Sequence, residues 1–150
     1  MLRPPVSIDA LMEEWANDAV MNETEPARDL AKIPNLHAKY LNILTHHNLI
    51  VKKITADYNK LKSIKWQYYS GDLNNPEDLE RYGLEPMPKK ILRQDISIHI
   101  DSDPELTTIL LKKMIHQEIV DYCTLVLKEI NARTWQLQNI VKLLIFNAGN

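Results

Sequence analysis

Apolar residues recur along the chain at the three- and four-residue spacing of amphipathic helices. After Ser7, a helix-capping residue, apolar side chains at i, i+3, i+4 and i+7 predict a first helix over about residues 8–21 with one buried face. Pro26 and Pro34 punctuate the stretch that follows, and they leave room for a short helix between them. The chain is therefore expected to begin with a short helical segment.

A long helix is predicted over residues 35–70, because neither proline nor glycine interrupts that stretch, and Gly71 is expected to end it. Its apolar residues fit a heptad repeat, with His47 and Asp57 as the two exceptions, and this pattern predicts packing against another helix along one seam. One set of heptad positions is Ile33, Tyr40, His47, Ile54, Leu61 and Tyr68, and the other is Leu36, Ile43, Ile50, Asp57 and Ile64.

Residues 72–103 are predicted to form a connector, since prolines and a glycine recur there. Asn75-Pro76 is expected to start one short helix that ends at Gly83. Further on, isoleucine alternates with polar residues over 96–100, which predicts a short extended segment. A single such segment cannot build a sheet, so it either pairs across subunits or lies on a helix.

Asp103-Pro104 is a strong start signal for a last helix, because aspartate caps helices and proline suits the first helical position. The apolar pattern then continues to residue 148, interrupted by His116 and Arg133. The predicted buried stripe consists of Ile109, Ile119, Val120, Cys123, Val126, Leu127, Ile130, Leu137, Ile140, Val141 and Leu144.

These elements predict an all-α fold, an elongated helical hairpin with flanking short helices. Its parts are an acidic helical segment over 1–34, a long basic helix over 35–71, the connector over 72–103 and a C-terminal oligomerisation helix over 104–150. The apolar stripe of the last helix is broader than one partner helix needs, so we expect self-association. The alternative is a compact monomeric bundle in which the first helix supplies the missing layer.

Composition excludes several classes of protein. Only three of the 150 residues are glycine, and they are too far apart for a phosphate-binding loop. The single cysteine, Cys123, forms neither an internal disulfide nor a cysteine zinc site, as expected in the reducing cytosol. No targeting segment, membrane-spanning run or catalytic constellation is visible, so we expect no enzyme, no bound metal, no cofactor and no membrane contact.

The formal net charge of −2 conceals a segregation of charge along the chain. Residues 1–31 carry seven acidic and two basic side chains, whereas residues 32–71 carry seven lysines and one acid. Lys89, Lys90 and Arg93 form a second basic cluster between acidic stretches. Such blocks are solvated faces or binding surfaces, and the acidic first segment is expected either to cover the basic face or to meet a partner.

Lysines and aromatic residues share one face at the end of the long helix. On a helix of 3.6 residues per turn, Lys62, Lys65, Trp66 and Tyr69 fall at i, i+3, i+4 and i+7, and Tyr58 joins them. Ammonium groups bind phosphates and aromatic faces stack on bases, so this face is a candidate site for single-stranded DNA without sequence specificity. The alternative is that the aromatic rings pack on a neighbouring subunit.

Tyr68-Tyr69-Ser70-Gly71 at the end of this basic helix resembles the UvsY recombination mediators of T4-like bacteriophages, and the resemblance covers roughly residues 33–150. Aligned on the double tyrosine, Lys65 fills the arginine position of the family's basic motif, Leu-Lys-Ala-Arg-Leu, whereas Ser63 stands where the family has lysine. The DNA-contact role thus carries over to Lys65 alone. The residues of the last helix at family spacing are Asp121, Cys123, Leu127, Ile130, Arg133, Ile140, Phe146, Ala148 and Gly149.

The resemblance implies a non-enzymatic protein of DNA recombination, repair and replication in the cytoplasm of an infected bacterium. Such a protein loads a RecA-like recombinase of the UvsX type onto single-stranded DNA coated by a phage single-strand-binding protein. It also implies a ring-shaped homo-oligomer of six to seven subunits, for which we expect the interface residues Cys123, Leu127, Ile130, Arg133, Leu137, Ile140 and Phe146. Arg133 should meet an acidic or carbonyl partner, in the same or a neighbouring subunit. The alternative function is a structural coiled-coil adaptor that binds no nucleic acid.

Overall fold

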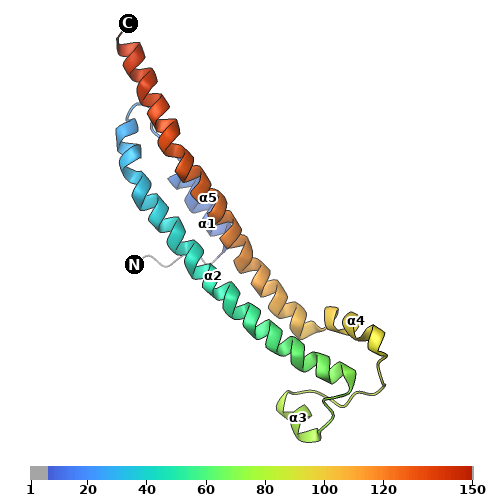
Figure 1. Cartoon of the computed structure of the whole chain (residues 1–150). Helices are drawn as coiled ribbons and strands as arrows, with labels where there is room; N and C mark the ends of the chain where they lie inside the picture. The colour runs from blue at the N-terminus through green and yellow to red at the C-terminus, as the bar shows by residue number, and fades with distance from the viewer. Residues whose placement is uncertain (1–6, 150) are drawn as a thin grey trace. The chain divides into compact units, whose positions relative to one another are not determined.

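The structure is a computed structural model that describes residues 7–149, and helices are its only regular secondary structure over that range. In chain order the helices are α1 (Ile8–Asp18), α2 (Pro26–Ser70), α3 (Pro76–Arg81), the 3-10 helix η1 (Arg93–Asp95), α4 (Ile96–Asp101) and α5 (Pro104–Ala148) (Figure 1). The predicted all-α class is confirmed. The chain forms two compact units, one from residues up to Ile50 together with those from Ile115 on, and the other from Val51–Met114.

The predicted capping residues begin three of the helices. Ser7, Asn75 and Asp103 each accept a hydrogen bond from a backbone N–H two or three residues further on, at 3.1–3.2 Å. These bonds satisfy N–H groups that have no partner inside the helix. At the other end, α2 stops before Gly71, whose φ of +86° is a conformation that glycine adopts without steric strain.

The predicted start of the long helix at residue 35 is wrong. Helix α2 begins at Pro26, which occupies the first helical position, and it continues through Pro34, so no separate short helix lies between the prolines. Pro34 lacks the N–H that would bond to the preceding turn. Its neighbours Ile33 and Leu36 both pack against the core of the first unit, and this packing holds the turn in helical form. The first predicted helix is also shorter than expected, ending at Asp18.

The extended segment predicted over residues 96–100 is also wrong, because these residues form helix α4. Ile96 and Ile100, one helical turn apart, are 3% and 2% exposed, whereas Ile98 between them is 64% exposed. Isoleucine at every second position fits both a strand and a single turn of helix when the segment is this short. Here burial of the first and third isoleucines together favours the helix.

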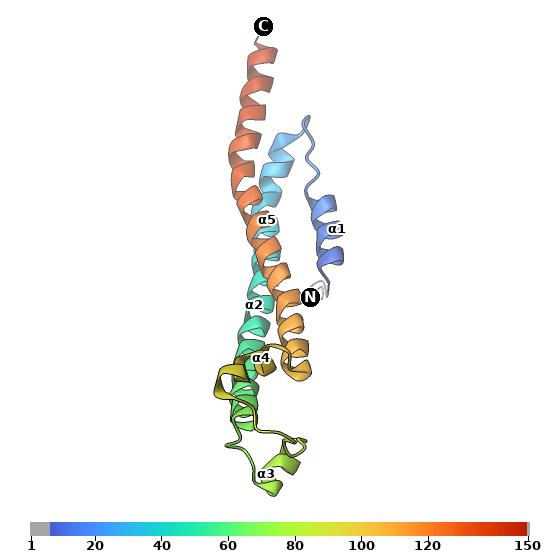
Figure 2. The ribbon, with the colours of Figure 1, turned by 90° about the vertical axis from the view of Figure 1, so that its right-hand side faces the viewer.

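Three helices build the core of the first unit. The first part of α2 and the later part of α5 lie side by side there, and α1 packs against them (Figure 2). Within this unit the first helix therefore does supply a third layer. The buried members of the core are Leu11, Tyr40, Ile43, Ile119, Cys123, Val126 and Ile130.

Two residues that interrupt the predicted apolar pattern contact each other in the first unit. His47, an exception to the heptad, is buried, and its Nδ1 lies 2.9 Å from Nδ1 of His116, which interrupts the stripe of α5. A buried polar side chain needs a hydrogen-bond partner, and the two imidazoles supply one to each other. Asp57, the other exception, is exposed.

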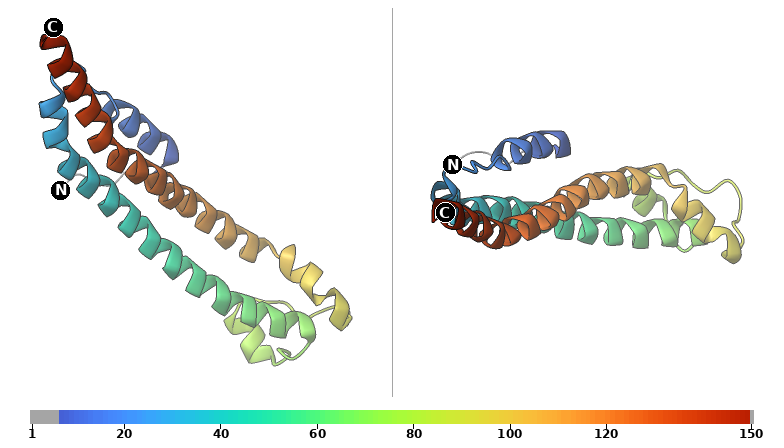
Figure 3. Two further views of the ribbon diagram at one scale, coloured as in Figure 1. Left: turned by 45° about the horizontal axis from the view of Figure 1, so that its top comes forward. Right: turned by 90° about the horizontal axis from the view of Figure 1, so that it is seen from above.

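The second unit has a smaller core around α4. Ile96, Ile100 and Leu106 are its buried residues. They belong to α4 and the first turn of α5, which follow one another along the ribbon (Figure 3). Tyr58, Leu61 and Tyr69 of α2 pack against them. This cluster brings the last turns of α2 next to the start of α5, and it thereby positions the basic and aromatic side chains described next.

Candidate nucleic-acid interface

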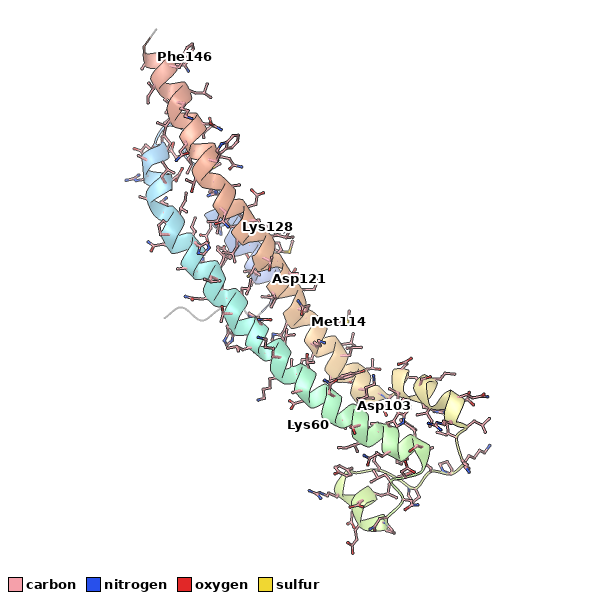
Figure 4. All side chains as sticks on the ribbon, viewed as in Figure 1. Lys60, Asp103, Met114, Asp121, Lys128 and Phe146 are labelled. Atoms are coloured by element: carbon pink, nitrogen blue, oxygen red, sulfur yellow. The ribbon has the colours of Figure 1, made fainter. Side chains whose placement is uncertain are left out.

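Of the five residues predicted to contact DNA, Lys62 and Trp66 are exposed on the second unit and Tyr58 is half-buried. Lys62 is exposed, and its Nζ lies 6.0 Å from the centre of the Tyr58 ring, within the range of a cation–π contact. Trp66, one turn further along α2, is 44% exposed. Lys60 also projects from α2, away from α5 (Figure 4). An ammonium group beside an aromatic ring and an exposed indole are suited to bind a strand's phosphates and bases.

Lys65 does not lie on this exposed face, contrary to the prediction. It is 5% exposed, and its Nζ lies 3.2 Å from Oδ2 of Asp103 and 3.6 Å from Oε1 of Glu105. The long side chain is thus turned toward the start of α5. A charge of this kind is retained in an interior only when it is paired, and the carboxylate of Asp103 supplies the pair. In the folded chain Lys65 is an internal ion-pair partner.

Tyr69 is also turned inward, contrary to the prediction. Its hydroxyl donates a hydrogen bond of 2.7 Å to Oδ2 of Asp103, and its ring lies 5.4 Å from the imidazole of His99. Burial raises the pKa of the Tyr69 hydroxyl above its ordinary value, and the hydrogen bond to Asp103 raises it further. This tyrosine stays neutral at physiological pH, and its orientation is fixed by the second unit itself.

Asp103 joins these groups, and sequence reasoning identified only its capping role. The residue is 2% exposed and accepts from the Leu106 N–H, the Tyr69 hydroxyl and the Lys65 ammonium. Burial raises the pKa of its carboxyl, but these hydrogen bonds and the charge of Lys65 outweigh burial, so the pKa lies below its ordinary value. The only signal in the sequence was the capping pattern at Asp103-Pro104. No residue near Asp103 in the sequence indicates that it pairs with Lys65, 38 positions earlier in the chain.

Most of the residues predicted for the oligomer interface lie inside the first unit. Cys123, Ile130 and Leu137 are fully buried, and Leu127 and Ile140 are half-buried. Their burial agrees with the predicted buried stripe, but within one chain these side chains already pack inside the first unit, whereas they were also expected to form the interface between subunits. For Cys123, Leu127 and Ile130 the physical reason is the third layer, because α1 covers a face that a two-helix hairpin would leave open. Among the predicted residues, Phe146 is the exception, at 67% exposure.

Arg133 is buried and hydrogen-bonds to backbone carbonyl groups of its own chain. Its guanidinium donates to the backbone oxygen of Ala19 at 2.6 Å and to that of Asp18 at 3.4 Å, and it lies 5.3 Å from the Trp15 ring. Backbone carbonyls at the end of a helix have no intrahelical donor and carry a partial negative charge. The guanidinium therefore holds the end of α1 against α5.

The acidic first helix also pairs with a basic residue of α2. Asp18 and Glu14 lie 2.7 Å and 3.2 Å from Nζ of Lys39, and the Tyr40 hydroxyl donates to Asp18 at 2.8 Å. Burial lowers the pKa of Lys39, but its bonds to Asp18 and Glu14 outweigh burial and hold that pKa above its ordinary value. Part of the acidic segment thus covers the start of the basic helix.

Among residues 7–149, no three histidine, cysteine, aspartate or glutamate side chains come together as a metal ion would require. None of the helices in this part of the chain combines the length and the apolar character needed to cross a membrane.

Comparison with known proteins assigns the chain to a family. Residues 14–150 match the profile of the family described as "Recombination, repair and ssDNA binding protein UvsY". No curated protein sequence gives a significant match. Crystal structures of the bacteriophage T4 recombination mediator protein UvsY have a similar fold. For lattice type II the TM-score is 0.83 at 19% identity, with 99% of each chain covered. For lattice type I it is 0.81 at 18% identity, with 92% of this chain and 98% of that chain covered. Because the family profile covers nearly the whole sequence, this chain belongs to the UvsY family.

Proposed function

We propose that the protein is a recombination mediator. It binds single-stranded DNA without sequence specificity and promotes the loading of a RecA-like recombinase of the UvsX type onto strands coated by a phage single-strand-binding protein. It acts without catalytic chemistry of its own, in the cytoplasm of the infected bacterium. The observation that carries this proposal is the family match over residues 14–150, whose description includes recombination, repair and single-stranded DNA binding.

The surface that supports DNA binding is the α2 face, which we define as Tyr58, Lys62 and Trp66. These residues stand at i, i+4 and i+8, so they follow one side of the helix. Lys62 offers a phosphate contact, and Trp66 offers a stacking surface worth about 1–3 kcal/mol per base. Neither group reads base edges. Mixed-sequence oligonucleotides are therefore expected to bind within about tenfold of each other, or about 1.4 kcal/mol.

The test is a titration of a labelled single-stranded oligonucleotide by fluorescence anisotropy at several salt concentrations. Lys62→Ala is expected to weaken binding and to reduce the slope of log affinity against log salt by about 0.7 per subunit contact. Trp66→Ala is expected to weaken binding without changing that slope, because stacking releases no counterions. Lys128→Ala, which removes an exposed lysine of the first unit, is the matched control.

Three outcomes would count against the proposal. If the unmodified protein shows no salt-sensitive binding, the chain is a structural adaptor rather than a mediator. If the wild type binds and both variants match the Lys128→Ala control, the α2 face is not the contact surface. A preference of a thousandfold for one short sequence would contradict binding without base readout.

We also propose that the chain forms a ring-shaped homo-oligomer through the end of α5. The last turns of this helix extend past the first turn of α2 (Figures 1 and 2), and four consecutive apolar side chains there are 43–67% exposed: Leu143, Leu144, Ile145 and Phe146. A hollow of about 600 Å³ lies alongside, between Pro26 at the start of α2 and Val141 on α5. Burying each large apolar side chain contributes roughly 1.5–3 kcal/mol.

Deletion of residues 143–150 tests this assembly and leaves the buried Arg133 and Leu137 in place. Sedimentation of the shortened chain is expected to show smaller species than the full chain. Those species should bind single strands weakly although the α2 face is intact, because linked weak sites bind more tightly than single ones. An assembly of unchanged size would show that another surface holds the oligomer together.

A further inference from the structure

A notch in the second unit lies beside the last turn of α2 and is separate from the α2 face. It has a volume of about 410 Å³. One wall is formed by Tyr69 to Asp72, and the other by residues 87–91 of the connector, which include the exposed Lys89 and Lys90. Two of the three residues of the basic cluster described in the sequence, Lys89 and Lys90, thus line a notch together with the end of the helix that carries the double tyrosine.

Both walls of the notch are anchored. On the helix side, the Tyr69 hydroxyl is held by Asp103 at 2.7 Å and its ring rests against His99. On the connector side, the Tyr68 hydroxyl donates a bond of 2.6 Å to the backbone oxygen of Glu85, and Ile91 packs on the core around α4. The notch is therefore bounded by residues tied to the core of the second unit. A preformed recess costs little ordering on binding.

The two walls carry opposite charge. Lys89 and Lys90 present ammonium groups, whereas the other wall presents the Asp72 carboxylate and the carbonyl end of α2. Ser70 donates to Asp72 at 3.2 Å and orients that carboxylate. A helix C-terminus carries a partial negative charge, so this wall favours hydrogen-bond donors and disfavours phosphate.

A nucleotide in a single strand matches this arrangement. Its phosphate is an anion for the lysine wall, its base has a flat face for an aromatic ring, and its base N–H groups are donors for the acceptor wall. In a duplex the base edges are paired and the faces are stacked, so a duplex does not offer the same groups. A wholly acidic peptide would satisfy the lysines but would meet repulsion from Asp72.

We propose that this notch binds one nucleotide of the single strand, as a second DNA contact on each subunit. This inference rests on the proposed function, which supplies the strand. Lys65 is then a positioning residue: through Asp103 it fixes Tyr69, which lines the notch.

The variant Lys89→Ala/Lys90→Ala tests the proposal on the full chain. Binding of labelled single-stranded oligonucleotides, of thymine and of cytosine, is measured against salt concentration. The matched control is Lys112→Ala/Lys128→Ala, which removes two exposed lysines outside the notch and changes the net charge equally. We expect a loss of at least tenfold for the first variant and less than twofold for the control. The slope of log affinity against log salt concentration should fall by about 1.4, because two phosphate contacts are lost at about 0.7 each.

Photo-crosslinking supplies a second measurement that does not depend on a variant. A single-stranded oligonucleotide with halogenated uracil is expected to cross-link to peptides that include residues 69–72 or 87–91. The proposal that the notch binds DNA would be overturned by a loss of affinity no greater than that of the control variant. It would also be overturned by cross-links confined to other parts of the chain. Failure of the unmodified protein to bind any single strand would instead overturn the proposed function, so the two failures are distinguishable.

Discussion

Replacement of Asp103 by asparagine separates the ion pair of this residue from its role as a helix cap. Asparagine caps helices about as well as aspartate, so the bond from the Leu106 N–H is retained. The carboxylate charge is lost, and the buried Lys65 ammonium is left facing an amide. Breaking a buried ion pair by removing one partner costs about 3–5 kcal/mol. Glu105, 3.6 Å from the same ammonium but largely exposed, offsets part of this cost. We therefore expect a loss near the lower limit, about 3 kcal/mol.

The assay is urea denaturation followed by far-UV circular dichroism. All variants are measured at one protein concentration, so that the proposed self-association affects each of them in the same way. Asp103→Ala should lose about 1 kcal/mol more than Asp103→Asn, because it also removes the cap. Asp101→Asn, a change of the same charge at an exposed position nearby, is the control and should stay within about 0.5 kcal/mol of the wild type.

The difference between wild type and Asp103→Asn should depend on pH. The pKa of Asp103 is lowered in the folded chain, so its contribution is fully present above the ordinary carboxyl value of 3.8. It is lost as the pH falls through the lower, folded-state pKa. Equal stability of the wild type and Asp103→Asn at neutral pH would refute the argument, and so would a difference that persists unchanged in strong acid.

Three further predictions concern the first unit. Burial raises the pKa of the Cys123 thiol to about 11 from 9.0, so alkylation of the folded chain at neutral pH should be at least about a hundredfold slower than in denaturant, and equal rates would contradict this burial. Arg133→Met should lower the free energy of unfolding by about 2–3 kcal/mol and expose α1 to proteolysis, since it removes charged hydrogen bonds to the backbone at Ala19 and a contact with Trp15. Uncut α1 in that variant would show that the arginine does not hold it. Pro34→Ala should increase the free energy of unfolding by about 1–2 kcal/mol and so raise the thermal midpoint, because it restores a backbone N–H donor within α2. A lower midpoint would show that proline is the more stable residue at this position.

Local signals in the sequence predicted the starts of α1, α3 and α5 and the end of α2 correctly. Ser7, Asn75 and Asp103 cap helices and Gly71 ends one, because each acts through backbone groups a few residues away. Pro34 misled the prediction, since packing on both sides of it outweighs the lost hydrogen bond. The isoleucines of α4 misled it too, because five residues do not distinguish the two periodicities.

The candidate site was predicted only in part, for a different reason. Helical spacing placed Tyr58 and Lys62 together correctly, since both belong to one helix. The same spacing placed Lys65 on the exposed face, whereas the structure buries it against Asp103. The direction of a long side chain near the edge of a core depends on which opposite charge the rest of the fold brings within reach. That information is not contained in the pattern of one helix.

The bond between Arg133 and the end of α1 has a consequence for how the chain acquires its structure during synthesis. The bonded residues Ala19 and Arg133 are 114 positions apart, so a ribosome adding about 5–20 residues per second separates them by about 6–23 s. The second unit, Val51–Met114, is one continuous stretch that is complete before Arg133 is added. The apolar face of α1 therefore stays without its partner on α5 until the last part of translation. A released chain that ends before Arg133 should hold an ordered second unit and an undocked first helix.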